Sequence, residues 1–324
     1  MAYAYSGPGQ KVEAMQVLLK WLCLALLHIF AALPHPIKKI IATVSEWLLY
    51  YANGRIRKIT ERNLAICFQN VPEEARTQLA RRSMFELSFG VLDLARCWIW
   101  KLQDLEQEVT GVVGSAHFRA AVTNGRGTLV LLPHLGSWEL ANLILSKDHT
   151  ITTLYREPKT AVIGDLIRRY RQRSGAKLVP IGTPGLRAVL EALRSNEMVT
   201  LLPDQVPPRQ FGKFAPFFGE PTLTMTLATN LIQRTGAKAV CAYCKRLPRG
   251  KYELVFLPVD DAIYDPECSV AVAALNRSIE RCVLDCVEQY QWAYKRFKIL
   301  PNLQKRNYLE TPVSGNEDVG HRQA

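Results

Sequence analysis

The sequence lacks the patterns that mark several common classes of protein. It contains no internal repeat and no low-complexity block, which excludes a repeat architecture. Gly136-Ser-Trp-Glu139 lacks the second glycine of the Gly-x-Ser-x-Gly elbow, so Ser137 is a poor candidate for a catalytic nucleophile. These absences argue against a solenoid and against a serine hydrolase of the usual kind.

The cysteines do not form a metal-binding framework. Cys241-Ala-Tyr-Cys244 has CxxC spacing, but on a strand its two thiols point to opposite faces, and no second ligand pair lies at zinc-finger spacing. Other cysteines lie in apolar patterns typical of small buried residues: Cys23, Cys67, Cys97, Cys282 and Cys286. We therefore expect reduced thiols in the core and no metal or other cofactor.

Acidic residues are too few to balance the basic ones. The chain has 41 Lys and Arg against 29 Asp and Glu, a formal net charge of +12, which predicts an anionic partner. From Arg156 to Lys213 there are eleven basic and five acidic residues. Nucleic acid fits poorly, because Arg168 to Arg173 is interleaved with a single aromatic residue, Tyr170. Lipid phosphates, an acidic carrier protein and an anionic membrane surface remain as partners.

One long apolar stretch lies near the N-terminus. Met15 to Leu33 is close to the roughly 20 residues that a membrane-spanning helix needs. Basic residues are more frequent after this stretch than before it, so the positive-inside rule places the rest of the chain in the cytoplasm. A helix lying in the membrane interface is nearly as good an interpretation. A signal peptide is less favoured, because no clear cleavage site precedes Pro34.

The rest of the chain predicts a helical region followed by an α/β core. Ile40 to Tyr51 and Glu73 to Trp100 have helical periodicity. Strands and helices then alternate. Strands are expected at Thr128 to Leu132, Thr150 to Tyr155, Met198 to Leu202, Ala239 to Lys245 and Tyr252 to Pro258, and helices at Trp138 to Leu145, Ala161 to Ser174, Leu186 to Arg194, Leu223 to Arg234 and Ser269 to Gln289. We expect a membrane anchor at residues 1–36, one catalytic domain at 37–302 and a loose polar tail at 303–324.

Polar residues follow three of these strands. His134 comes after the apolar run that ends at Pro133, Arg156 follows the next strand, and Asp204 follows the strand that ends at Leu202. Ligands of open α/β sheets bind beyond the carboxyl ends of the strands. The sequence therefore predicts that these three residues meet at one edge of the sheet.

His134 and Glu139 suggest acyl-transfer chemistry at this edge. A carboxylate on one ring nitrogen orients a histidine so that the other nitrogen can remove a proton from an alcohol. In that interpretation Glu139 orients the ring and His134 is the general base. The alternative is structural: Glu139 and Ser137 cap the following helix and His134 is a hydrogen-bonded core residue.

The motifs together resemble those of the bacterial lipid A biosynthesis lauroyl/myristoyl acyltransferases, within the lysophospholipid acyltransferase superfamily. His134-(x4)-Glu139 matches the His-(x4)-acid motif of that superfamily. The more specific blocks are Arg62-Asn-Leu64, Pro203-Asp204-Gln205, Phe214-Ala-Pro-Phe-Phe-Gly219, Thr222-Leu-Thr-Met-Thr226, Thr235-Gly-Ala237 and Glu288-Gln-Tyr-Gln-Trp-Ala-Tyr-Lys-Arg-Phe-Lys298. The similarity runs from about Ile40 to Pro301.

The resemblance implies a glycerolipid-acyltransferase-like α/β fold, with a mixed sheet flanked by helices and an N-terminal anchoring helix. It implies an enzyme of the cytoplasmic face of a Gram-negative inner membrane, which moves a fatty acyl chain from acyl carrier protein to a hydroxyl of a lipid A precursor. No metal is needed, and His134 and Glu139 are the catalytic pair.

Substrate binding is expected at Arg156, Arg169, Asp204 and Gln205. Arg156 would bind an anionic group or stabilise the oxyanion, unless it forms a surface ion pair with Glu157 or Asp165. Gln205-Val-Pro-Pro208 departs from the Asp-Tyr-Gly continuation of the family. A lysophospholipid, ornithine lipid or glycolipid acceptor, or a catalytically inactive membrane-associated scaffold, therefore remains an alternative.

Overall fold

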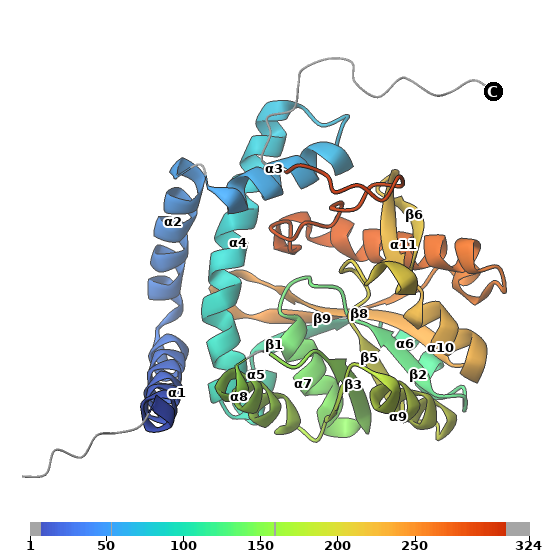
Figure 1. The fold of residues 1–324 in the computed structure, drawn as a ribbon, viewed down its shortest axis with the longest axis horizontal. Helices are drawn as coiled ribbons and strands as arrows, with labels where there is room; N and C mark the ends of the chain where they lie inside the picture. The colour runs from blue at the N-terminus through green and yellow to red at the C-terminus, as the bar shows by residue number, and fades with distance from the viewer. Residues whose placement is uncertain (1–7, 53, 159, 309–324) are drawn as a thin grey trace, which may run out of the picture.

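The structure, a computed structural model, describes residues 8–52, 54–158 and 160–308. Its centre is a seven-stranded mixed sheet in the order β1-β9-β8-β2-β5-β3-β4 (Figure 1). The strands are β1 (Val109–Val113), β2 (Thr128–Leu131), β3 (Ile151–Tyr155), β4 (Lys177–Pro180), β5 (Met198–Leu201), β8 (Lys238–Arg246) and β9 (Tyr252–Pro258). The five strands from β8 to β4 are parallel, and β9 runs antiparallel to β8. The expected mixed α/β sheet is confirmed.

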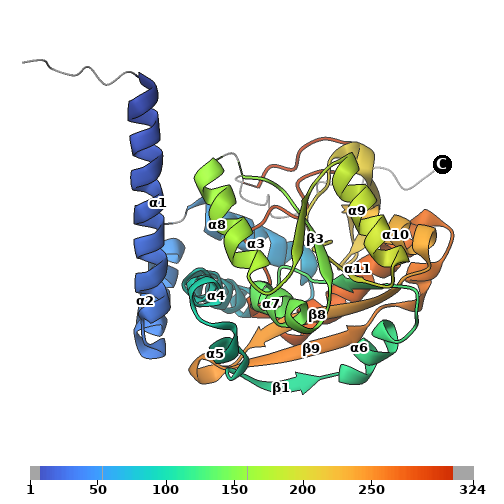
Figure 2. The ribbon, with the colours of Figure 1, turned by 90° about the horizontal axis from the view of Figure 1, so that it is seen from below.

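Helices cover both faces of this sheet (Figures 1 and 2). Residues of α9, α10 and α11 pack with one face, and residues of α6 and α7 pack with the other. The helices are α1 (Pro8–Ala32), α2 (His35–Tyr51), α3 (Arg55–Cys67), α4 (Glu73–Ile99), α5 (Leu102–Glu106), α6 (Ser115–Val122), α7 (Trp138–Asp148), α8 (Ala161–Gln172), α9 (Thr183–Arg194), α10 (Leu227–Thr235) and α11 (Cys268–Asp285). A separate hairpin consists of β6 (Gly212–Phe217) and β7 (Glu220–Met225).

The cysteines of the CxxC sequence lie on opposite faces of the sheet, as strand alternation predicts. Cys241 belongs to the core between the sheet and α11, whereas Cys244 belongs to the core on the α7 side. Both thiols are free and fully buried. They act as small apolar core residues.

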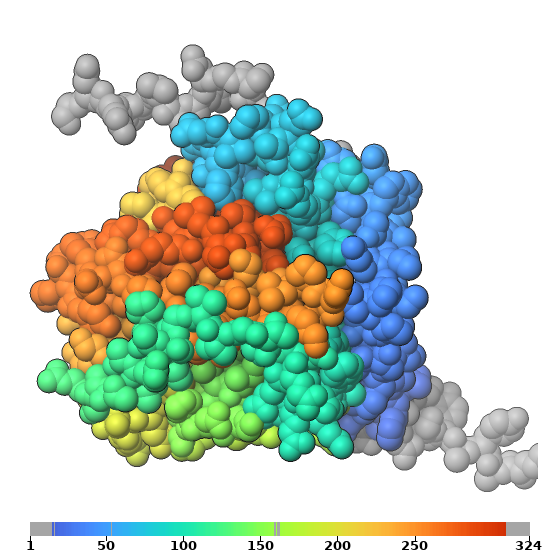
Figure 3. Space-filling model, turned by 180° about the vertical axis from the view of Figure 1, so that it is seen from behind, coloured from blue at the N-terminus to red at the C-terminus, as the bar shows by residue number. Residues whose placement is uncertain are grey.

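The first two helices lie against α4 along one side of the molecule (Figures 1 and 3). By length and composition, no single helix among the described residues could cross a membrane. Helices α1 and α2 are separated by a break between Ala32 and His35 and are bent by 114°. Only as a pair are they long and apolar enough to cross a membrane. Large apolar side chains on this pair are nevertheless exposed, including Trp21, Leu22, Ile29, Ile40, Val44 and Trp47. We call these six residues the apolar face.

The helix expected from Leu223 to Arg234 begins later than predicted. Residues up to Met225 form β7, because Leu223 and Thr224 are buried against the C-terminal segment. The buried Arg296 side chain donates hydrogen bonds to the Leu223 carbonyl (2.8 Å) and to Thr224 Oγ1 (3.0 Å). The last predicted helix, Ser269 to Gln289, ends earlier than predicted, at Asp285. A short 3-10 turn (Val287–Gln289) follows it.

The C-terminal segment is tied to α3 by a buried asparagine. Asn63 Nδ2 donates to the carbonyls of Trp292 and Tyr294, each at 2.7 Å, and Tyr308 Oη donates to Asn63 Oδ1 at 3.0 Å. The start of the predicted tail is therefore packed, since Tyr308 is almost fully buried. The rest of that tail, residues 309–324, lies outside the described residues. These bonds fix the segment that holds Tyr290 and Gln291 beside the site.

Candidate active site

His134 and Asp204 meet because they follow adjacent parallel strands by the same number of residues. Leu131 of β2 pairs with Leu201 of β5, and each site residue lies three positions farther along. His134 Nδ1 lies 2.7 Å from Asp204 Oδ1, and the His134 main-chain N–H donates to Asp204 Oδ2 at 2.9 Å. One carboxylate therefore holds both the ring and the backbone of the histidine.

The loop after His134 depends on a glycine. Gly136 has φ +58°, and a Cβ there would lie 2.1 Å from the Cys244 carbonyl oxygen. The next main-chain N–H, that of Ser137, donates to this same oxygen at 2.7 Å. On the other side, the Gln291 N–H donates to the His134 carbonyl at 3.1 Å. The loop thus lies between β8 and the C-terminal segment.

The carboxylate of Asp204 defines the proton positions on the imidazole. Burial alone would raise the pKa of Asp204, but the adjacent His134, through its charge and its two hydrogen bonds, and the more distant Arg296 together hold this pKa below its ordinary range. A carboxylate only accepts hydrogen bonds, so His134 Nδ1 donates to Asp204, and in the neutral imidazole Nε2 carries the lone pair. Gln205 Nε2 lies 3.1 Å from that lone-pair nitrogen.

Glu139 does not make the contact with His134 that the sequence suggested. Its buried carboxylate pairs with Arg171 of α8, where Arg171 Nε donates at 2.8 Å and Nη2 makes a second bond. Arg171 also lies over the Trp138 ring, 4.9 Å from its centroid. The acid that orients His134 is Asp204, and Glu139 joins α7 to α8. Ser137 is at the helix N-cap position, but its side chain makes no capping bond.

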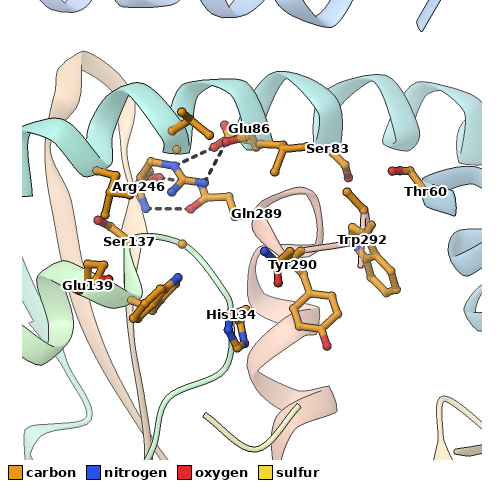
Figure 4. A pocket seen from close by; sticks show the side chains of 18 residues that line it. Thr60, Ser83, Glu86, His134, Ser137, Glu139, Arg246, Gln289, Tyr290 and Trp292 are labelled. Carbon is orange, nitrogen blue, oxygen red and sulfur yellow. Dashed lines mark hydrogen bonds and ion pairs between the residues drawn. The ribbon is translucent and has the colours of Figure 1, made fainter. Parts of the chain in front are cut away.

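His134 lines a cavity of about 230 Å³ beneath α4 (Figure 4). Glu139, Ser137 and Gln291 line the same cavity, and α4 contributes both polar and apolar side chains. The α4 residues are Ser83, Glu86, Leu87, Gly90, Val91 and Leu94. The His134 side chain is 15% exposed, so the ring is held inside the protein while remaining accessible to a ligand.

A partly buried ion pair strengthens one wall of the cavity. Arg246 Nε donates to Glu86 Oε2 at 2.9 Å, which joins the end of β8 to α4 (Figure 4). The Gln289 side chain bonds both the N–H and the carbonyl of Arg246, each at 2.9 Å. The cavity is therefore bounded by elements that hydrogen bonds hold in place.

None of the four expected binding residues is among those that line the cavity. Asp204 and Gln205 instead contact the two ring nitrogens of His134. Arg156 and Arg169 are exposed, and neither is among the lining residues. Glu157 and Asp165 are the acids proposed to pair with Arg156. Both pair with Arg168 instead. The strand ends thus bring together His134, Asp204 and Gln205, and Arg156 remains at the surface.

The sequence interpretation missed Arg171, Arg246 and Gln291. The orienting role of Asp204 had a signal in the sequence, because the predicted strands place His134 and Asp204 at equal distances beyond their ends. Among the described residues, no group of His, Cys, Asp and Glu side chains could hold a metal ion.

The profile of the family described as bacterial lipid A biosynthesis acyltransferase matches residues 8–299. The chain belongs to this family of acyltransferases. It is 27% identical over 293 residues to the lipid A biosynthesis lauroyltransferase of Escherichia coli strain K12, covering 87% of this chain and 92% of that protein. It is 26% identical to the lipid A biosynthesis palmitoleoyltransferase of the same strain, covering 90% and 94%.

A relative that acts outside lipid A biosynthesis is also similar. The phosphatidylinositol mannoside acyltransferase of Mycobacterium tuberculosis strain CDC 1551 / Oshkosh is 30% identical over 145 residues, covering 43% of this chain and 46% of that protein. The acyltransferase family is therefore clear, while its relatives act on more than one lipid acceptor.

Asp204 predicts a defined pH dependence of folding stability. Because its pKa is lower in the folded protein than in the unfolded chain, ionised Asp204 stabilises the fold above about pH 4, the ordinary range of the group. This contribution is lost as the pH falls through the folded-state pKa. We expect Asp204→Asn to lower the free energy of unfolding by about 2 kcal/mol at pH 6, with a smaller difference from wild type below pH 4. Thermal unfolding in detergent from pH 3 to 7 measures the difference in stability between wild type and Asp204→Asn. A difference that stays constant across this range would contradict the prediction.

Proposed function

We propose that this acyltransferase moves a fatty acyl chain, of the lauroyl or myristoyl class, from acyl carrier protein to a hydroxyl of a lipid A precursor. The observation that carries the proposal is the state of His134 in a chain of this family. Its Nδ1 donates to a buried carboxylate, which leaves the lone pair of the neutral ring on Nε2, and the residue lines the cavity. This is the arrangement that a general base needs.

In the proposed reaction His134 acts on the acceptor hydroxyl. Nε2 takes the hydroxyl proton as the oxygen attacks the thioester carbonyl, and the carbonyl π electrons move to its oxygen. When the carbonyl re-forms, the carbon–sulfur bond breaks, and the imidazolium returns the proton to the departing thiolate. Asp204 stabilises the imidazolium between these two steps. The reaction needs no covalent acyl-enzyme.

Glu139 supports this site indirectly. It lines the cavity, but both of its oxygens engage Arg171, so it holds α8 against the helix that follows the histidine loop. Arg156 and Arg169 are exposed cations at the surface, available to anionic groups of the carrier protein or of the lipid headgroup.

A second candidate acceptor is a glycolipid outside lipid A biosynthesis. The similarity to the mycobacterial acyltransferase favours it, and so does the sequence Gln205-Val-Pro-Pro208, which departs from the usual lipid A pattern. Lysophospholipid and ornithine lipid acceptors would use the same base and thioester. An inactive scaffold would show no His134-dependent transfer to any of these lipids.

The proposed location is the cytoplasmic side of the inner membrane. The apolar face of α1 and α2 is exposed. Lys39 of α2 and Arg55 of α3 are exposed cations close to it in sequence, and Lys58 of α3 is partly exposed. Exposed apolar side chains beside cations are typical of helices that lie in a membrane interface. We therefore propose interfacial insertion of this bent helix pair.

The transfer reaction is tested with membrane-extracted protein, lauroyl- or myristoyl-acyl carrier protein and a tetra-acylated lipid A precursor. We expect mass spectrometry to show a product heavier by one acyl chain. His134→Ala should lower its rate of formation by about 10²–10⁴-fold, because the general base is lost.

The matched control for this assay is His117→Ala, at an exposed histidine that does not line the cavity. It should retain the wild-type rate. If wild type acylates only another lipid, the proposed lipid A acceptor is wrong. If His134→Ala transfers the acyl chain at the wild-type rate, His134 is not the general base.

Membrane insertion is tested by placing charges on the apolar face. We expect Trp21→Glu combined with Trp47→Glu to weaken binding to phosphatidylethanolamine/phosphatidylglycerol vesicles by about 10-fold or more, since two large apolar groups no longer enter the bilayer. Vesicle co-sedimentation measures the change. Leu284→Glu, at an exposed leucine of α11, is the control and should bind as wild type does. Equal binding by both variants would contradict the location of the contact.

A further inference from the structure

Two consecutive residues hold both ring nitrogens of His134. Asp204 contacts Nδ1 at 2.7 Å, and Gln205 places its amide nitrogen 3.1 Å from Nε2. The same amide nitrogen lies 3.2 Å from Gln291 Oε1. A chain of hydrogen bonds therefore runs from Asp204 through the imidazole and Gln205 to Gln291.

The count of protons fixes the direction of every bond in this chain. Because Asp204 only accepts, the single proton of the neutral imidazole lies on Nδ1, and Nε2 then has a lone pair that accepts from a donor. An amide oxygen could not donate, so the –NH₂ group of Gln205 must face Nε2. Its second N–H then points to the Gln291 carbonyl oxygen, which accepts it. The orientations of both amides follow from the carboxylate at the other side of the ring.

Gln291 is itself firmly held. Its main-chain N–H donates to the His134 carbonyl at 3.1 Å, and the neighbouring Trp292 carbonyl accepts a bond from Asn63 at 2.7 Å. Its side chain lines the cavity. Gln291 thus keeps the Gln205 amide beside His134 even when Nε2 makes a different bond.

The main-chain N–H groups around the histidine are already engaged. Those of His134 to Ser137 donate to Asp204, Pro133, Gln289 and Cys244. Those of Tyr290, Gln291 and Trp292 donate to the Val287, His134 and Tyr290 carbonyls. None of these seven groups is free for a substrate oxygen, so the site has no main-chain oxyanion hole in these two segments.

We infer that Gln205 is the donor that stabilises the tetrahedral oxyanion, and that Gln291 is the positioning residue that aims its amide. This inference rests on the proposed function of His134. When the acceptor hydroxyl bonds Nε2, it displaces one Gln205 N–H, while Gln291 retains the other. The displaced N–H lies next to the attacked carbon, where the carbonyl oxygen gains negative charge. The charge leaves that oxygen when the carbonyl re-forms and the thiolate departs.

The test compares variants of Gln205 that differ in their ability to donate. Gln205→Met keeps the size and removes the donor, and Gln205→Glu keeps the shape but replaces the –NH₂ group by a second oxygen, which accepts and does not donate. We expect both to lower kcat by about 10²–10³-fold, the loss typical of removing one oxyanion donor, while KM for the lipid changes by less than about threefold. A variant whose KM rises at an unchanged kcat would overturn the inference, since Gln205 would then bind the acceptor.

The test of Gln291 uses rescue by a conservative change. Gln291→Glu retains an oxygen that accepts from Gln205, whereas Gln291→Met does not. We expect Gln291→Met to lower kcat by about 10-fold, and Gln291→Glu to be several-fold faster than Gln291→Met at equal thermal stability. Equal rates for the two variants would overturn the positioning role.

Thioester hydrolysis separates this inference from the proposed acceptor. Slow release of free fatty acid from acyl carrier protein needs the same oxyanion donor but no lipid. If wild type hydrolyses the thioester without acylating the lipid A precursor, the acceptor is wrong, and the Gln205 variants are compared on hydrolysis. If the Gln205 variants hydrolyse at the wild-type rate while His134→Ala does not, Gln205 is not the donor. His117→Ala, at the exposed histidine outside the cavity, is the control and should leave hydrolysis within about threefold of wild type. A loss in this variant equal to that of the Gln205 variants would overturn the assignment.

Discussion

The parallel pairing of β2 with β5 is the constraint on which the site depends. It sets Leu131 beside Leu201, so that two chain segments leave the sheet together and bring His134 against Asp204. The carboxylate then bonds the ring and the main chain of the histidine at once. A slip of this register by one residue would reverse the side on which each side chain points. The chemistry of the site is therefore specified by strand pairing in the core.

The short motif from His134 to Glu139 has two separate physical roles. Its histidine belongs to the strand end and is held by Asp204, while its glutamate belongs to the first turn of α7 and pairs with Arg171. The sharp turn between them requires Gly136, since any Cβ there would collide with the Cys244 carbonyl. Removing one partner of a buried ion pair is costly, because the other charge stays buried. The motif thus joins a reactive group to a structural link between two helices.

The sequence predicted the residues that strand ends and alternation control. The α/β order, the opposite faces of Cys241 and Cys244, and the meeting of His134 with Asp204 all follow from period and position. It did not predict contacts made by long side chains between distant elements. Arg171 reaches Glu139 across 32 residues and Gln205 reaches Gln291 across 86, and local patterns contain no information about such pairs. The β7 strand was taken for part of a helix because Arg296, far along the chain, determines its burial.

The identity of the acid that serves the histidine is tested most directly by comparing Asp204→Asn with Glu139→Gln in one acyl-transfer assay. Asparagine can donate to Nδ1, which would place the proton on Nε2 and remove the base. We expect Asp204→Asn to lower kcat by about 10²–10⁴-fold. Glu139→Gln can still accept from Arg171, so the factor by which it lowers kcat should be at least tenfold smaller. A larger loss for Glu139→Gln than for Asp204→Asn would contradict the account.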